Sequence, residues 1–282
     1  MLLNASMLRS LYVNHRKSIQ FIASEAGVSR TCVTNAMKLH GIDRRRRGPV
    51  PETEADCSCL DPLTPDGAYL LGVIWSDGNL RQDLREVRVS MADRDVIEYL
   101  TQLICPEKSP KEIPARQPTH QTQYQWSSCD RTFISRLVQF GLHPAKSSTL
   151  TAPEDVPESL RSHFVRGFID GDGSWYLGSG GYRTLRLSVV SASQWFMETL
   201  RSWLPVEGKN INRHSGGAVW VMEFAEKDAI RIGNWIYSTN HFGMDRKRQK
   251  YREGCRLFID RMLERADCSK WSRVMTEFTR AN

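Results

Sequence analysis

The sequence predicts an α+β protein, in which a small helical domain precedes two copies of one larger repeat. Three observations predict this class. A helix-like stretch, Leu70–Gly78, has a second copy at Val165–Gly173. A strand-like stretch follows each copy, and Val87–Met91 matches Leu185–Val189 in its alternation. Ahead of both copies, residues 18–42 have the pattern of a helix-turn-helix.

Composition indicates what kind of partner the protein binds and in which compartment it works. The chain has 282 residues, a formal net charge of +7 and a sequence pI near 9.1, which favour a polyanionic partner. No apolar run reaches membrane-spanning length, and the first residues lack the apolar core of a signal peptide. The seven cysteines form no C-x-x-C pair, so a zinc site is not expected. We therefore expect a cytoplasmic protein with reduced thiols. The helix-turn-helix fused to the larger repeated fold suggests that a bacterium or phage encodes it.

The predicted helix-turn-helix has its own apolar stripe and turn. Ile19 and Ile22 begin the stripe, Gly27 suits the turn, Ser29 can cap the second helix, and Val33 continues the buried side. This pattern leaves polar residues of the second helix outward, as candidates for a DNA major groove: Arg30, Thr31, Thr34, Asn35 and Lys38. An ordinary helical hairpin without DNA contact is the alternative.

Four consecutive arginines follow, and they favour the DNA-binding interpretation. Arg44, Arg45, Arg46 and Arg47 cannot pack together in a core, whereas they could contact phosphates. The stretch after them is acidic, contains proline and has no periodicity, which is typical of a linker. The predicted domains are residues 1–47 for the helix-turn-helix, 48–62 for the linker, 63–150 for the first repeat and 151–282 for the second with its C-terminal helices.

Each long repeat begins with a helix that ends at an aspartate. Thr64-Pro65-Asp66 and Pro157-Glu158 are helix starts, and a glycine follows Asp77 and Asp172. Small residues four positions apart give each helix a face that allows close backbone approach: Gly72 and Ser76 in the first, Gly167 and Gly171 in the second.

Packing through these faces would place the two terminal aspartates side by side. Helix C-termini already carry partial negative charge, so the pair is repulsive unaided. A divalent cation would relieve the repulsion, and oxygen ligands suit Mg²⁺. The spacing therefore predicts a metal site at Asp77 and Asp172.

The two stretches resemble the LAGLIDADG motif of homing endonucleases, in the single-chain form with two motifs. The acidic eighth position is Asp77 in one copy and Asp172 in the other, whereas Trp75 departs from the motif where the second copy keeps Asp170. The resemblance covers residues 63 to 255. It implies two pseudo-symmetric αββαββα repeats whose sheets form a DNA-binding saddle.

The resemblance also implies the chemistry. Asp77 and Asp172 would bind Mg²⁺ (or Mn²⁺), with Ser76 and Gly171 as further members of the metal site. Gly141–Ser147 resembles the family's Gly-Leu…Lys-Ser segment, and Phe242–Lys247 is a looser counterpart. By this resemblance Lys146 and Lys247 would lie near the scissile phosphates and act in catalysis, with one aspartate serving each DNA strand.

Polar side chains alternate along the predicted strands and are candidates for base contacts. Val87, Val89 and Met91 would face the helices, and the residues between them would face outward. Amide side chains can pair with adenine and arginine with guanine. The candidate set is Arg88, Ser90, Gln121, Gln123, Gln125, Arg183, Arg186, Ser188, Asn210, Asn212 and Arg213. The alternative is the polar alternation of any half-solvated strand.

These observations favour a site-specific, double-strand DNA endonuclease, of the kind associated with intron mobility. We expect a monomer that acts as a pseudo-dimer on a long, asymmetric duplex. A DNA-binding transcription regulator that no longer cleaves is the main alternative, because such regulators also combine this fold with a helix-turn-helix. An RNA maturase is the third.

Overall fold

The computed structural model describes residues 3–15, 17–44, 54–115, 117–179, 183–214, 216–217 and 219–265. The chain divides into two compact units, Met1–Gly48 and Pro49–Asn282, which are described separately. Within the described residues, no helix combines the length and hydropathy that crossing a bilayer requires.

The first unit is a group of short helices with a core of its own. It contains α1 (Ala5–Leu8), the π-helix η1 (Arg9–Asn14), α2 (Ile19–Ala26) and α3 (Arg30–Leu39). Ser18 and Ser29 cap α2 and α3, each accepting a bond from the backbone three residues later. Gly27 ends α2 in the left-handed conformation, at φ 67°. Both helices expected between residues 18 and 42 are thus present, whereas α1 and η1 were not predicted.

The second unit repeats one order of elements twice. The first repeat contains α4 (Pro65–Asp77), β1 (Gly78–Leu80), β2 (Val87–Met91), α5 (Arg94–Ile104), β3 (Lys111–Ile113), β4 (Gln123–Ser128) and α6 (Arg131–Gln139). The second contains α7 (Arg161–Asp172), β5 (Gly173–Leu177), β6 (Leu185–Ser191), α8 (Gln194–Trp203), β7 (Asn212–Arg213), β8 (Trp220–Ala225) and α9 (Lys227–Ile236). Two short 3₁₀ helices, η2 (Lys146–Ser148) and η3 (Glu158–Leu160), lie between the repeats, and α10 (Asp245–Arg265) follows. The α+β class and the αββαββα order are confirmed.

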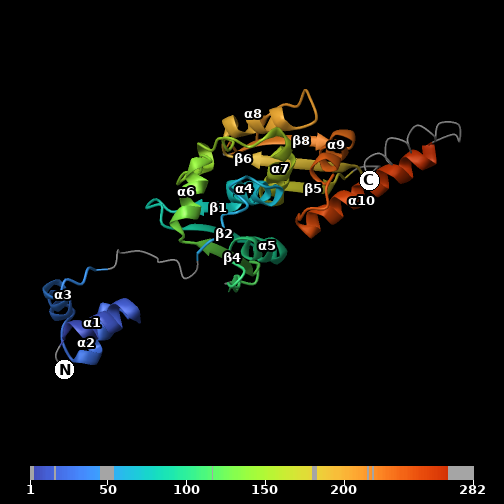
Figure 1. Ribbon diagram of the computed structural model, residues 1–282. Coiled ribbons are helices and arrows are strands. Elements are labelled where there is room, and N and C mark those ends of the chain that lie inside the picture. The colour runs from blue at the N-terminus through green and yellow to red at the C-terminus, as the bar shows by residue number, and fades with distance from the viewer. Residues whose placement is uncertain are drawn as a thin grey trace. The chain divides into compact units, whose positions relative to one another are not determined.

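The two sheets have the same topology. Each has four antiparallel strands, in the orders β1-β2-β4-β3 and β5-β6-β8-β7. Residues 87–91 of β2 and 185–189 of β6 alternate between buried apolar and outward polar positions, as predicted. In Figure 1, α4 and α7 lie between the two sheets, and α5, α6, α8 and α9 surround them.

Close packing of α4 against α7 holds the repeats together. A side chain at Gly72 would place its Cβ 2.1 Å from the Phe164 carbonyl oxygen, and one at Gly167 would lie 2.2 Å from the Tyr69 oxygen. Both neighbours are backbone atoms of the facing helix, so only glycine fits at this distance. The predicted small-residue faces therefore form the helix–helix contact.

Element ends differ from the predictions by a few residues. The first amide-rich strand begins at Gln123, so Gln121 lies before it, and β7 is only two residues long. The strand expected from Ala218 begins at Trp220. Helices were expected from Asp245 to Arg280; α10 extends to Arg265, and the remainder lies outside the described residues.

Candidate active site

The two motif aspartates lie at the last positions of α4 and α7, beside the helix contact. Each helix ends because the following glycine, Gly78 or Gly173, is extended and begins the first strand of its repeat. A Cβ on Gly171 would lie 2.2 Å from the Asp77 carboxylate and 2.0 Å from the Ser76 hydroxyl. The absence of a side chain at Gly171 therefore lets Asp77 approach the end of α7, next to Asp172.

Burial makes both carboxylates costly to ionise. It raises the pKa of Asp77, and the ammonium groups of Lys247 and Lys146 oppose that rise only in part. Burial, followed by the charge of Asp77, raises the pKa of Asp172 to about 6. Oδ2 of Asp77 is buried and has no hydrogen-bond partner among the described residues. Additional positive charge at this point would therefore stabilise the pair.

Two buried lysines donate hydrogen bonds to the C-terminal ends of α4 and α7. Nζ of Lys146 donates to the carbonyl oxygens of Trp75 and Ser76, at 2.6 and 3.0 Å. Nζ of Lys247 donates to three oxygens at the end of α7, those of Ile169, Asp170 and Gly171, at 2.7, 2.5 and 3.2 Å. The side chains thus satisfy carbonyls that the helix leaves free. This contact was not predicted, and a role at the scissile phosphates stays a prediction.

Burial also weakens the positive charge of these lysines. It lowers the pKa of Lys146, and the charges of Asp172 and Asp77 oppose that change. It lowers the pKa of Lys247 to about 8, against the opposing charge of Asp170. Both lysines and both aspartates therefore belong to one electrostatic group at the helix ends.

The sixth motif positions differ in chemistry, and both are structural. Trp75 is buried and its Nε1 donates to the carbonyl oxygen of Thr151 at 2.8 Å, which ties α4 to the connection between the repeats. Asp170 accepts from the Tyr69 hydroxyl at 2.9 Å and from the Met244 backbone at 2.8 Å. Burial raises the pKa of Asp170 to about 6. Tryptophan in place of the motif's aspartate at position 75 therefore does not alter the placement of Asp77 and Asp172 at the helix ends.

The donor set at the helix ends suits a hard divalent cation in part. Asp77 and Asp172 supply oxygen ligands, and one of these oxygens has no other partner among the described residues. The carbonyl oxygens of Ser76 and Gly171 already accept from the lysines. No group of three acidic, histidine or cysteine side chains with metal-binding geometry occurs among the described residues. Water or phosphate oxygens would have to complete the coordination, which is usual for Mg²⁺.

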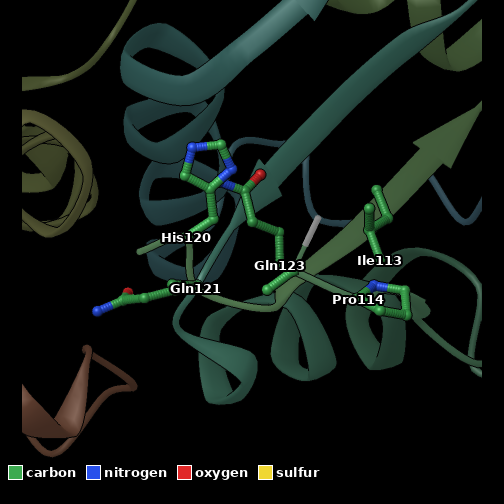
Figure 2. Close-up of a pocket in the computed structure, with 7 residues that line it drawn as sticks. Ile113, Pro114, His120, Gln121 and Gln123 are labelled. Carbon is green, nitrogen blue, oxygen red and sulfur yellow. The ribbon is translucent and has the colours of Figure 1, made fainter. Parts of the chain in front are cut away.

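The open face of the first sheet carries the predicted polar residues together with an unpredicted acid. Arg88, Ser90 and Gln125 face outward, and the Gln125 amide donates to the Ser90 hydroxyl at 2.8 Å. Arg88 donates to Glu86 at 2.9 Å, so its charge is paired. Gln123 and Gln121 line a recess of about 500 Å³ with Ile113, Pro114 and His120; in Figure 2 the Gln121 side chain points away from Ile113 and Pro114.

The open face of the second sheet is also mixed in charge. Arg186, Ser188 and Asn212 face outward with Glu223, which accepts from Tyr176 at 3.2 Å. Arg213 does not share this face. It pairs with Trp220 on the helix-covered side, its guanidinium 5.7 Å from the Trp220 ring centroid, because alternation along the two-residue β7 turns it away from Asn212. Of the other two candidates, Asn210 is exposed, and exposed Arg183 lies 4.0 Å from Glu253.

The helix-turn-helix candidates are mostly solvent-exposed. Arg30, Thr31, Asn35 and Lys38 are exposed on α3, and Arg44 is exposed after it. Thr34 is half-buried, and its hydroxyl donates to the Arg30 carbonyl oxygen at 2.9 Å. Arg45, Arg46 and Arg47 lie outside the described residues.

Solved structures similar to this chain include LAGLIDADG homing endonucleases, although no protein-family model and no curated protein matches it. The LAGLIDADG meganuclease I-AabMI, solved with uncleaved DNA, is 13% identical with a TM-score of 0.46, over 69% of this chain and 90% of that one. Meganuclease I-SmaMI, solved with uncleavable DNA, is 15% identical with a TM-score of 0.49, over 72% and 91%. Full-length DUF199/WhiA from Thermatoga maritima is 14% identical with a TM-score of 0.46, over 76% and 65%. At such low identities and scores, these likenesses decide nothing about function.

Proposed function

We propose that this protein is a metal-dependent, site-specific endonuclease of double-stranded DNA. One observation carries the proposal: two half-buried aspartates lie together at the ends of the paired helices α4 and α7, and both have raised pKa values. Keeping two such carboxylates at one helix contact is unfavourable for stability alone. Perturbed acids grouped in this way are typical of a functional site.

The protein's own residues account for the positioning of the reaction. Asp77 and Asp172 would hold Mg²⁺ (or Mn²⁺), which when bound activates water and stabilises the leaving oxygen of the phosphodiester. Each aspartate is the last residue of the first helix in its own repeat, so each is suited to one strand of a duplex. Lys146 and Lys247 bind the helix ends and reduce the repulsion between the carboxylates.

The two sheets support a duplex partner. Their open faces present amide, hydroxyl and guanidinium groups, which are the groups that read base edges in a major groove. Because the two faces carry different residues, the target would be long and asymmetric. One chain contains both repeats, so a monomer would suffice.

Cleavage of a DNA library tests the proposal directly. A library of random and source-genome fragments is incubated with the full chain and Mg²⁺, with Ca²⁺ as the non-catalytic control, and the new ends are sequenced. We expect discrete ends with Mg²⁺ alone. Tight, site-specific binding without new DNA ends would instead support a transcription regulator that does not cleave. Preferential binding or cleavage of RNA, offered in a parallel reaction, would support an RNA maturase.

A further inference from the structure

The net positive charge of the chain lies entirely in its first unit. Residues 1–48 contain nine lysines and arginines but only two acidic residues, whereas residues 49–282 contain 30 of each kind. The chain's +7 therefore belongs to the first unit, and the second unit is formally neutral. A unit without net charge is not attracted as a whole to the phosphate backbone, and only its local lysines and arginines can release counterions from DNA.

The structure of the second unit agrees with this neutrality at its open faces. Arg88 is paired with Glu86, and Glu223 lies on the same face as Arg186. Base-reading groups are present there, but their positive charge is offset locally. These open faces therefore offer phosphates little unpaired positive charge, whereas the first unit holds the whole excess of positive charge in the chain.

The first unit presents such a surface on α3. Val33 and Met37 are fully buried in a core that also contains Leu8 and Ile22, so α3 has a fixed inner side. The outer side presents Arg30, Thr31, Asn35 and Lys38, and the α3 sequence contains no acidic residue. The left-handed turn at Gly27 and the Ser29 cap set the start of this helix against α2. A helix held in this way can enter a major groove with its outer side.

We propose that the first unit is a second, separate binding surface for duplex DNA, and that it supplies most of the ionic affinity of the whole chain. Arg30 and Lys38 contact phosphates, and Thr31 and Asn35 face base edges. The body then reads and cleaves its target while the first unit keeps the chain on DNA. The inference rests on the proposed function only in that both surfaces bind DNA, and its test needs no cleavage.

The test measures binding of the full chain to a 40-base-pair duplex of random sequence, by fluorescence anisotropy between 50 and 200 mM KCl in EDTA. The variant is Arg30→Gln/Lys38→Gln. Lys227→Gln/Arg231→Gln is the matched control, because it also removes two exposed positive charges from one helix. That helix, α9, packs on the second sheet and belongs to the second unit.

The salt dependence gives the expected size of the effect. Each lost phosphate contact lowers the slope of log K against log salt by about 0.9, which is about eightfold in affinity at 0.1 M salt. We expect the Arg30→Gln/Lys38→Gln variant to bind up to about 60-fold more weakly with a slope about 1.8 smaller. The control should bind like the unaltered chain, and far-UV circular dichroism should be the same for all three.

Three outcomes would overturn the proposal. The first is equal binding by the Arg30→Gln/Lys38→Gln variant and the unaltered chain. The second is equally strong competition by single-stranded RNA of the same length. The third is sedimentation showing that α3 joins two copies of the chain, for which exposed Leu39 offers an apolar contact. The binding measurements do not depend on cleavage. A protein that fails to cut the library would refute the endonuclease proposal and leave the test of DNA binding by the first unit intact.

Discussion

Replacing Asp172 with asparagine should make the protein more stable at neutral pH while abolishing the proposed DNA cleavage. The ordinary carboxyl pKa is 3.8, and in the folded protein burial and the charge of Asp77 raise that of Asp172 to about 6. The folded state therefore binds a proton more tightly than the unfolded state. Stability falls as pH rises from 3.8 to about 6, and the full penalty remains at pH 7.

The penalty follows from the difference in pKa. At about 1.4 kcal/mol per pKa unit, ionised Asp172 lowers the free energy of unfolding by about 3 kcal/mol. The side chain is partly exposed, so solvent reduces this figure, and we expect Asp172→Asn to gain about 1–3 kcal/mol at pH 7. The gain should vanish at pH 4, where the native carboxyl is protonated.

Urea unfolding in EDTA, followed by tryptophan fluorescence, measures the effect. All eight tryptophans lie beyond residue 48, so the signal reports on the second unit alone. Asp260→Asn is the control, because Asp260 is exposed on α10, and it should change stability little at either pH. An unchanged or lower stability of Asp172→Asn at pH 7, or a gain that persists at pH 4, would refute the reasoning.

Three further variants test the helix contact and its surroundings. Gly167→Ala would place a Cβ 2.2 Å from the Tyr69 backbone oxygen, so the free energy of unfolding in urea should fall by about 3 kcal/mol or more. Gly243→Ala should lose less, because its Cβ would meet only side-chain atoms at 3.1 Å or more. Lys247→Met removes a charge that lowers the pKa of Asp172, so the acid limb of the cleavage pH profile should move above pH 6, and Lys250→Met should leave it unmoved. Trp75→Phe leaves the Thr151 oxygen without its donor, so calorimetry should show a loss of about 1–3 kcal/mol with DNA binding retained.

The repeated architecture could be predicted because its signals are local and occur twice. Thr64 and Pro65 indicate a helix start, Gly78 indicates its end, and Gly72 with Ser76 requires a closely packed partner. Alternation in β2 and β6 assigns their buried sides correctly for the same reason. The helix α1 was not predicted, because its four residues are too few to show an apolar period. Its start does carry a capping residue, since the Asn4 side chain accepts from the Met7 backbone.

The surroundings of the site could not be predicted, because they depend on contacts between distant residues. The buried amines of Lys146 and Lys247 bond to helix ends 70 or more positions away, and sequence spacing carries no record of that contact. Pairing of Arg88 with Glu86 likewise depends on side-chain direction at a strand end. Arg213 was placed with the amide residues because a strand of two residues is too short for its alternation to be read.

The central claim is that Asp77 and Asp172 form one shared site with one carboxylate for each strand. Its most direct test uses the target found in the library, labelled on both strands, with Asp77→Asn and Asp172→Asn as separate full-length variants in Mg²⁺. We predict that neither variant makes double-strand breaks, while both bind the target in Ca²⁺ about as tightly as the unaltered chain. If either single variant still cuts both strands at the unaltered rate, the shared site is wrong.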